Sequence, residues 1–275
     1  MKRLNEDHAA LSAASTGIGL CTIVNIDGSF SRRLGAQLAI NADGTFAGSL
    51  SDGCLENQLA SDIKECTVPT VRRYGSGSDR IDFRLPCGGG LDILLDPAPD
   101  TACCKEAVDD ITNRRPARLS LPQNPFLLER HYIPKLNVRV FGEEPELGVF
   151  SRIANACDVA CEAIDRSSLS LGQKPDLPPA DRWTATLLLF HDHDWEREIL
   201  KHALAGDSYF IGAQGGENAR QERIGWLASE GFGMSQIARV RSPVGATPSS
   251  RTPHSLALSI MDEIVSKYEA LHPHG

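Results

Sequence analysis

A loop of small residues runs directly into a single cysteine in the stretch Gly48-Ser49-Leu50-Ser51-Asp52-Gly53-Cys54-Leu55-Glu56. Behind it, apolar residues recur at the spacing of an α-helix, at Leu55, Leu59 and Ile63. Polar residues fill the positions between them, which is typical of an amphipathic helix with one face in a hydrophobic core. The sequence therefore predicts a loop and then a helix that begins beside the cysteine.

The predicted helix start gives Cys54 its chemical interest. Asp52 or Gly53 is the expected N-cap, so Cys54 belongs to the first turn. The unpaired N–H groups and the positive end of the helix dipole favour a thiolate at this position. Such a thiolate acts as a nucleophile, a persulfide carrier or a soft metal ligand. The alternative is a small apolar residue that only packs at the helix start.

The composition is that of an acidic globular protein. The chain has 275 residues, of which 41% are hydrophobic and 23% charged, and a net charge of −8. This length favours two domains, and the negative charge argues against a general nucleic-acid surface.

The sequence contains no pattern typical of export or membrane insertion. Polar residues instead of an apolar core follow Met1-Lys2-Arg3, and no apolar run is long enough to span a bilayer. Eight cysteines occur without a CxxC pair, so we expect them to be mostly reduced and to form no structural zinc site. These observations predict a soluble cytoplasmic protein.

Short apolar runs in the first part of the chain predict β-strands. They cover residues 20–26, 37–41, 45–48, 68–74, 81–85 and 91–95. The loop between the first two carries the pair Arg32-Arg33, and the last strand follows Cys87-Gly88-Gly89-Gly90. Glycines permit positive φ and a close approach of the backbone, and their N–H groups can form an anion-binding concavity. The alternative for the triplet is a flexible turn between strands.

The chain divides into three parts by composition. Residues 1–98 form an N-terminal mixed α/β domain, and 99–135 form a proline-rich linker with a helix over 101–113 and a strand over 126–131. In residues 136–275, strands over 138–141, 158–164, 184–191 and 209–213 alternate with helices over 146–156, 195–205, 218–230 and 253–268. Such alternation predicts a Rossmann-like, doubly wound parallel sheet with helices on both faces.

The dinucleotide fingerprint of such a domain is incomplete. After the first strand the turn reads Gly142-Glu143-Glu144-Pro145-Glu146-Leu147-Gly148, with Glu144 in place of the middle glycine. Glutamates suit the start of a helix but repel a pyrophosphate. Asp165 ends the second strand, where an acid binds a ribose hydroxyl. Gly142 and Asp165 therefore leave an NAD(P)-dependent oxidoreductase as one alternative.

In order along the chain, these motifs resemble those of the XdhC/CoxI family, the accessory proteins of xanthine dehydrogenase and related molybdenum hydroxylases. Ser29–Ala36 resembles the family's arginine loop, Gly48–Glu56 its first cysteine motif, and Cys87–Gly90 its Cys-Gly-Gly-Gly motif. Val138–Gly142 resembles the first strand of its Rossmann domain. Asp52 departs from the pattern, because a glycine stands there in the family.

The resemblance implies a non-enzymatic chaperone that binds molybdenum cofactor (molybdopterin). It further implies help with sulfuration of the cofactor and its insertion into a xanthine dehydrogenase-type apoenzyme. A cysteine desulfurase is a further expected partner, and a homodimer the expected assembly. Cys54 and Cys87 are then expected at the cofactor and Arg32 at its phosphate or pterin, with Gly53, Gly88 and Gly89 beside them. Two alternatives stay open, the NAD(P) enzyme and a thiol or persulfide carrier that uses Cys54.

Overall fold

The computed structural model describes residues 6–17, 19–51, 53–78, 88–247 and 249–274. Contacts divide the chain into two units, Met1–Lys135 with His272–Gly275 and Leu136–Leu271. Residues 99–135, which the sequence analysis treats as a linker, form a helix and a two-stranded hairpin. The apolar face of the helix, with Cys104, Ala107 and Ile111, is buried in the first unit, because an amphipathic helix needs a partner for that face.

The first unit contains an antiparallel sheet with the strand order β3-β2-β1-β5-β4. Its elements are α1 (Glu6–Ala14), β1 (Gly19–Asp27), β2 (Gln37–Ile40), β3 (Phe46–Gly48), α2 (Cys54–Glu65), β4 (Thr70–Gly75), β5 (Gly90–Asp96), α3 (Thr101–Thr112), β6 (Ala117–Ser120) and β7 (Glu129–Tyr132). The five strands of the sheet follow the sequence prediction closely, β6 was not predicted, and the predicted strand at 81–85 lies outside the described residues. Helix α1 was not predicted.

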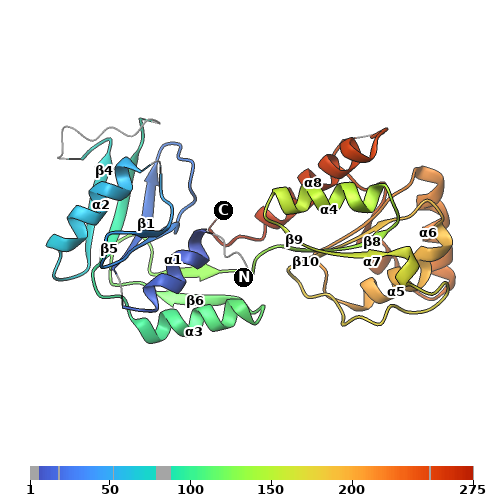
Figure 1. The fold of residues 1–275 in the computed structure, drawn as a ribbon, viewed down its shortest axis with the longest axis horizontal. Helices are drawn as coiled ribbons and strands as arrows, with labels where there is room; N and C mark the ends of the chain where they lie inside the picture. Colours follow the sequence, from blue (N-terminus) through green and yellow to red (C-terminus); the bar gives the residue numbers. More distant parts are fainter. Residues whose placement is uncertain (1–5, 18, 52, 79–87, 248, 275) are drawn as a thin grey trace. The chain divides into compact units, whose positions relative to one another are not determined.

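Strand β1 shows how the two faces of this sheet are covered. Leu20 and Val24 join one core with α1 and α3, whereas Cys21 and Ile23 join a second core with α2. This follows from the two-residue period of a strand, which sends alternate side chains to opposite faces. Figure 1 shows α2 on one side of the sheet and α1 and α3 on the other.

Helix α2 is fixed to the sheet by apolar and polar contacts. Leu55, Leu59 and Ile63 are buried in the second core, as the helical spacing predicts. The carboxylate of Asp62 accepts a hydrogen bond from the Tyr74 hydroxyl at 2.6 Å and pairs with Arg72 at 3.2 Å. Because both partners belong to β4, this buried carboxylate sets the position of the helix along the sheet.

The second unit is built on a parallel sheet with the order β12-β11-β10-β8-β9. Its elements are β8 (Asn137–Gly142), α4 (Glu146–Ala156), β9 (Ala160–Asp165), η1 (Arg166–Ser168), β10 (Thr184–Leu189), η2 (His193–Trp195), α5 (Glu196–Ala205), β11 (Phe210–Ala213), α6 (Glu217–Ser229), α7 (Met234–Ile237), β12 (Val240–Arg241) and α8 (Pro253–Glu269). Read from β9, the strands follow the 2-1-3-4-5 order of one class of doubly wound fold. The predicted Rossmann-like α/β fold is confirmed.

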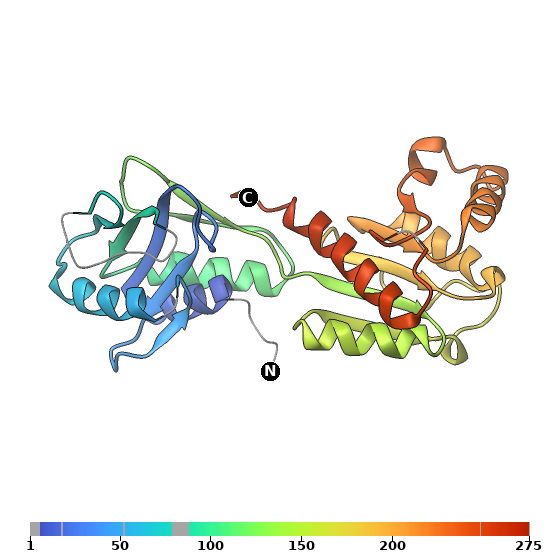
Figure 2. The ribbon, with the colours of Figure 1, turned by 90° about the horizontal axis from the view of Figure 1, so that it is seen from above.

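Helices cover both faces of this parallel sheet. The buried sides of α5, α6 and α7 pack against Phe141, Leu188 and Ile211. Helices α4 and α8 lie side by side on the other face (Figure 1), and Figure 2 shows the same pair from above. No helix in the described ranges is long and apolar enough to cross a membrane.

Leu59 provides a test of how the first unit holds α2. We expect Leu59→Ala to lower the free energy of unfolding by about 3 kcal/mol, because it removes a fully buried side chain and leaves a cavity. Urea unfolding followed by circular dichroism measures this change. Asn57→Ala, at an exposed position of the same helix, is the control. Equal unfolding curves for the two variants would contradict this packing.

Candidate functional site

Three loops leave the sheet of the first unit toward the same edge. The last residue of β1, Asp27, pairs with the first residue of β5, Gly90, which also pairs with the last residue of β4. The end of β3 pairs with the start of β2 through Gly48 and Leu38. The three loops therefore leave the strands in the same direction, although Gly48 lies level with Cys21 and Gly90 with Asp27 along β1.

The carboxylate of Glu56 organises the Cys54 loop. Its Oε1 accepts from the backbone N–H groups of Leu50 at 3.0 Å and Ser51 at 2.6 Å, and its Oε2 accepts from Gly53 at 2.7 Å. Gly53 is the N-cap, with a φ of 95° that favours glycine. Glu56 reaches back to the cap as the third helical residue often does. These amides are occupied by the protein's own carboxylate.

Cys54 begins α2, so its predicted place in the first turn is confirmed. Its side chain is exposed, whereas Cys21 and Cys104 are buried in the two cores. An exposed thiol at a helix start is accessible to a partner or a metal. The reading of Cys54 as a buried packing residue is therefore wrong.

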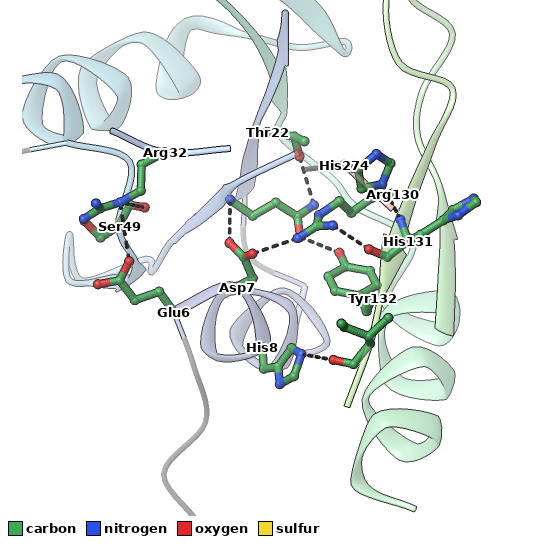
Figure 3. Close-up of polar contacts among 12 residues, drawn as sticks. Glu6, Asp7, His8, Thr22, Arg32, Ser49, Arg130, His131, Tyr132 and His274 are labelled. Atoms are coloured by element: carbon green, nitrogen blue, oxygen red, sulfur yellow. Dashed lines mark hydrogen bonds and ion pairs between the residues drawn. The ribbon is translucent and has the colours of Figure 1, made fainter. Parts of the chain in front are cut away.

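Arg32 connects the arginine loop to the Cys54 loop. Its Nη2 donates to Ser49 Oγ at 3.1 Å and its Nε to the Ser49 carbonyl at 3.4 Å, and Glu6 lies 3.5 Å from Nε. Figure 3 shows the guanidinium between Ser49 and Glu6. Nη1 has no hydrogen-bond partner among the described residues, so the guanidinium keeps donors for a ligand.

An ion pair between Arg130 and Asp7 packs against the end of the arginine loop at Gly35. Arg130 is 1% exposed and its Nη2 pairs with Asp7 Oδ2 at 2.7 Å, while Asp7 Oδ1 accepts from the Gln37 backbone at 3.3 Å (Figure 3). A Cβ atom at Gly35 would lie 2.6 Å from Arg130 Cδ, so the loop needs glycine there. Neither Asp7 nor Arg130 is among the site residues predicted from the sequence. The one available signal was an arginine in a predicted strand.

Three histidines surround this ion pair. Burial lowers the pKa values of His8, His272 and His274 to about 4. Nearby Arg130 acts in the same direction on each, whereas Asp7 opposes it. Each of two neutral rings has a defined role, since His8 Nε2 donates to the Ile133 carbonyl and His274 Nε2 accepts from the His131 backbone.

The glycine triplet has at least two separate roles. Gly88 is exposed and has a φ of 70°, a backbone conformation that favours glycine. The Gly89 carbonyl accepts from Ser76 N at 2.9 Å, and Gly90 lies against the Arg73 guanidinium, which leaves no room for a side chain. Gly90 thus serves packing. Cys87 lies outside the described residues, and its role stays a prediction.

Gly142 and Asp165 belong to the second unit, where both have structural partners. A Cβ atom at Gly142 would lie 2.6 Å from the Leu189 carbonyl oxygen, so the adjacent strand requires glycine. Asp165 caps η1 by accepting from Ser167 N at 2.8 Å, and this hydrogen bonding lowers its pKa. Their roles in binding a cofactor stay predictions.

Carboxylates fill the start of α4, where a dinucleotide fold binds pyrophosphate. Glu143 pairs with Arg166 at 2.6 Å, and Glu146 lies 3.2 Å from His191 Nε2. The Glu144 carboxylate lies over Gly148, 2.5 Å from where a Cβ atom would be. In the part of the chain that the structure describes, no three His, Cys, Asp or Glu residues are grouped to hold a metal ion.

The two units match two parts of one protein family. Residues 11–75 match the XdhC and CoxI family, and residues 138–264 match the XdhC Rossmann domain. The chain belongs to the XdhC/CoxI family.

Two individual proteins resemble this XdhC/CoxI chain over nearly its whole length. The molybdenum cofactor insertion chaperone PaoD of Escherichia coli (strain K12) is 29% identical, over 96% of this chain and 89% of the relative. A crystal structure described as a xanthine dehydrogenase from Bacillus halodurans has a TM-score of 0.72 and 19% identity. It covers 98% of this chain and 97% of its own, and it supports the fold alone.

Glu56 provides a test of the Cys54 loop in this XdhC/CoxI protein. We expect Glu56→Gln to lower the free energy of unfolding by about 2 kcal/mol, because it weakens charge-assisted bonds to three amides. Hydrogen exchange of the Leu50, Ser51 and Gly53 amides should also become faster. Glu65→Gln, a more exposed carboxylate on the same helix, is the control for both measurements. Unchanged exchange in Glu56→Gln would contradict the role given to this carboxylate.

The buried histidines predict a dependence of stability on pH. The unfolded chain protonates them near their ordinary pKa of 6.5, whereas the folded chain keeps them neutral to about pH 4. The free energy of unfolding is therefore highest above about pH 6.5 and falls as the pH approaches 4. His8→Gln keeps an N–H donor but removes one titrating group. Protonation of His8 alone accounts for a loss on the order of 3 kcal/mol in the free energy of unfolding between about pH 6.5 and pH 4.

Urea unfolding at several pH values between 4 and 7 measures the slope of the free energy of unfolding against pH. We expect a smaller slope in His8→Gln than in the wild type. His254→Gln changes an exposed histidine of α8 and should keep the wild-type slope. A wild-type slope in both variants would show that the titration of His8 does not contribute to the pH dependence of stability.

Proposed function

We propose that this protein binds molybdenum cofactor and assists its insertion into a molybdenum enzyme. Its likeness to a molybdenum cofactor insertion chaperone extends over 96% of the chain and supports this function. The match to the XdhC and CoxI family over residues 11–75 spans the arginine and Cys54 loops. The cofactor is cargo in this proposal, taken up and passed on.

One observation carries the proposal. Arg32 donates to Ser49, which belongs to the same loop as the exposed Cys54. A soft thiol and a guanidinium with unused donors therefore project from two loops that are hydrogen-bonded to each other. Glu56 occupies the loop amides, so the side chains of Cys54 and Arg32 remain as the contacts for a ligand.

The two side chains suit the two chemical ends of the cargo. Molybdenum and sulfur are soft partners of a thiolate, which fits Cys54. A phosphate is bound well by a guanidinium through paired, charge-assisted hydrogen bonds, which fits Arg32. Cys87, Gly88 and Gly89 extend this proposed site, since Gly89 lies beside the start of the arginine loop, where a Cβ atom at Gly28 would be 3.6 Å from Gly89 Cα.

The finer parts of the proposal concern sulfuration and partners. An exposed thiol at a helix start is suited to carry a persulfide, which supports assistance in sulfuration with a cysteine desulfurase as the sulfur donor. The acceptor would be a xanthine dehydrogenase-type apoenzyme, and the working form a homodimer. The same thiol also supports the second candidate, a persulfide carrier that binds no pterin.

A dinucleotide-dependent activity has less support. Glu143, Glu144 and Glu146 surround the start of α4, and two of them are paired with Arg166 and His191. A pyrophosphate would have to displace these carboxylates or approach them, at a cost in electrostatic repulsion. Titration with NAD(H) and NADP(H) tests this alternative directly.

The central test is uptake of the cofactor. Purified protein is mixed anaerobically with molybdenum cofactor, separated by gel filtration, and assayed for bound pterin by fluorescence. We expect stoichiometric uptake by the wild type. In Cys54→Ala the affinity should fall at least about tenfold, equivalent to about 1.4 kcal/mol of binding free energy. Arg32→Gln should also weaken uptake, because it removes donors to the phosphate.

Cys103→Ala is the matched control, because Cys103 is an exposed cysteine of α3 outside the three loops. It should bind as the wild type does. No uptake by folded wild-type protein would overturn the proposal. Persulfide formation on Cys54 without any pterin uptake would instead favour the carrier.

A further inference from the structure

A cavity of about 460 Å³ lies in the second unit among α6, α7 and β12. This volume is in the range of small-molecule sites, which are mostly apolar with a few polar groups. Its apolar wall is formed by Ile224, Leu227, Met234, Ile237, Val240 and Pro243. Met234 is 66% exposed, so a large flexible side chain stands at the surface beside the cavity.

The polar part of the lining is cationic. Arg220, Arg223 and Arg241 all line the cavity, and none of its described lining residues is acidic. Each arginine has one carboxylate partner, Glu217, Glu196 and Glu263 respectively. All three carboxylates lie outside the lining, so the surface that faces a ligand is positive although the local charges balance.

Arg223 gives this wall its rigidity. Its side chain is buried and holds Glu196 through Nε at 2.5 Å and Nη2 at 2.8 Å, and Nη1 donates to Ser242 Oγ at 2.6 Å. Nη2 also donates to the Gln214 carbonyl. This guanidinium thereby ties α5, α6 and the ends of β11 and β12 together, and its role at the cavity is structural.

The other two arginines keep donors for a ligand. Arg241 is bound through Nε to Glu263 at 2.6 Å, and Arg220 through Nη1 to Glu217 at 3.0 Å. Within the described ranges, the hydrogen bonds of Arg241 leave Nη1 and Nη2 unused, and those of Arg220 leave Nε and Nη2 unused. Both side chains are about half exposed, so an incoming anion can reach them.

The cavity is separate from the crevice where a dinucleotide binds in this fold class. That crevice lies at the switch point between β8 and β10, where Glu143 and His191 meet. The cavity instead lies beside β12, the edge strand on the side of β11. The anionic start of α4 therefore gives no reason to exclude an anion here.

We propose that this cavity binds an organic phosphate, with its phosphate on Arg220 and Arg241 and a flat ring against the apolar wall. Two guanidinium groups require an anion with several acceptors, and phosphate offers more than carboxylate does. Ile237, Pro243 and the adaptable Met234 suit a ring more than a charged chain. The site uses neither Cys54 nor Arg32, so it stands independently of the proposed cofactor site.

Calorimetric titration of the full chain tests this assignment. The probes are the four nucleoside 5′-monophosphates, the corresponding nucleosides and inorganic phosphate. We expect at least one monophosphate to bind more tightly than its nucleoside and than inorganic phosphate. Arg220→Gln and Arg241→Gln should each weaken that binding by roughly tenfold, whereas Cys54→Ala should bind as the wild type does.

Arg197→Gln is the matched control, because Arg197 is a half-exposed helical arginine with a carboxylate three residues away and does not line the cavity. Arg241→Gln leaves Glu263 without its ion pair. If Arg241→Gln does not fold for this reason, the result for Arg220→Gln decides the test. The proposal is overturned if folded wild-type protein binds no monophosphate, if inorganic phosphate binds equally well, or if Arg220→Gln binds as Arg197→Gln does.

A competition experiment identifies the source of the phosphate. Displacement of the bound monophosphate by molybdenum cofactor, together with weaker cofactor uptake in Arg220→Gln, would assign the cavity to the cofactor's phosphate and would overturn the assignment of that phosphate to Arg32. Simultaneous binding of both would assign it to a free nucleotide. Either result supports an organic phosphate site, and neither depends on the outcome for Cys54→Ala.

Discussion

The candidate site of the first unit depends on one buried carboxylate. Glu56 accepts from three backbone amides of the loop before α2, and its own position is fixed by the buried face of the helix it belongs to. A helix start leaves N–H groups that need acceptors, and here the chain supplies the acceptor itself. The turn is thereby held in one conformation, and Cys54 is presented to solvent at its end.

The arginine loop is fixed by a second buried group, from a distant part of the sequence. Arg130 lies 123 residues from Asp7, yet the two form an ion pair that also binds the Gln37 backbone and lies against Gly35. Removing one partner of a buried pair is costly, because the other charge is left in a low-dielectric site. The neutral histidines beside Arg130 avoid adding a further positive charge.

Periodic patterns made most of the fold predictable. Helix α2 carries a clear 3.6-residue period, most strands of both sheets are short apolar runs, and in the second unit such runs alternate with helical patterns. Helix α1 has a weak apolar period, because four of its nine residues are alanine and only one is leucine, and its burial depends on tertiary contacts with β2 and β3. A strand over 126–131 was predicted and overlaps β7, but its partner β6 was not, since four prolines suggested a linker.

The chemistry of the site was predictable only where it is local. The small-residue loop before the helical period of Leu55, Leu59 and Ile63 marks a helix start, and the place of Cys54 in the first turn follows from it. Contacts between distant segments, such as Arg32 with Ser49 or Arg130 with Asp7, leave no trace in a single sequence. Gly90 shows the same limit, because the need for glycine there comes from Arg73 on the adjacent strand.

In both units, glutamates stand at the start of helices. Glu56 occupies the start of α2, the glutamates at 143, 144 and 146 surround that of α4, and Glu217 begins α6. In many α/β proteins such starts bind phosphate through backbone amides. Because carboxylates stand beside these starts and repel an anion, we expect affinity for an anionic ligand to come from side chains instead. The arginines with unused donors, Arg32 in the first unit and Arg220 and Arg241 in the second, meet that requirement.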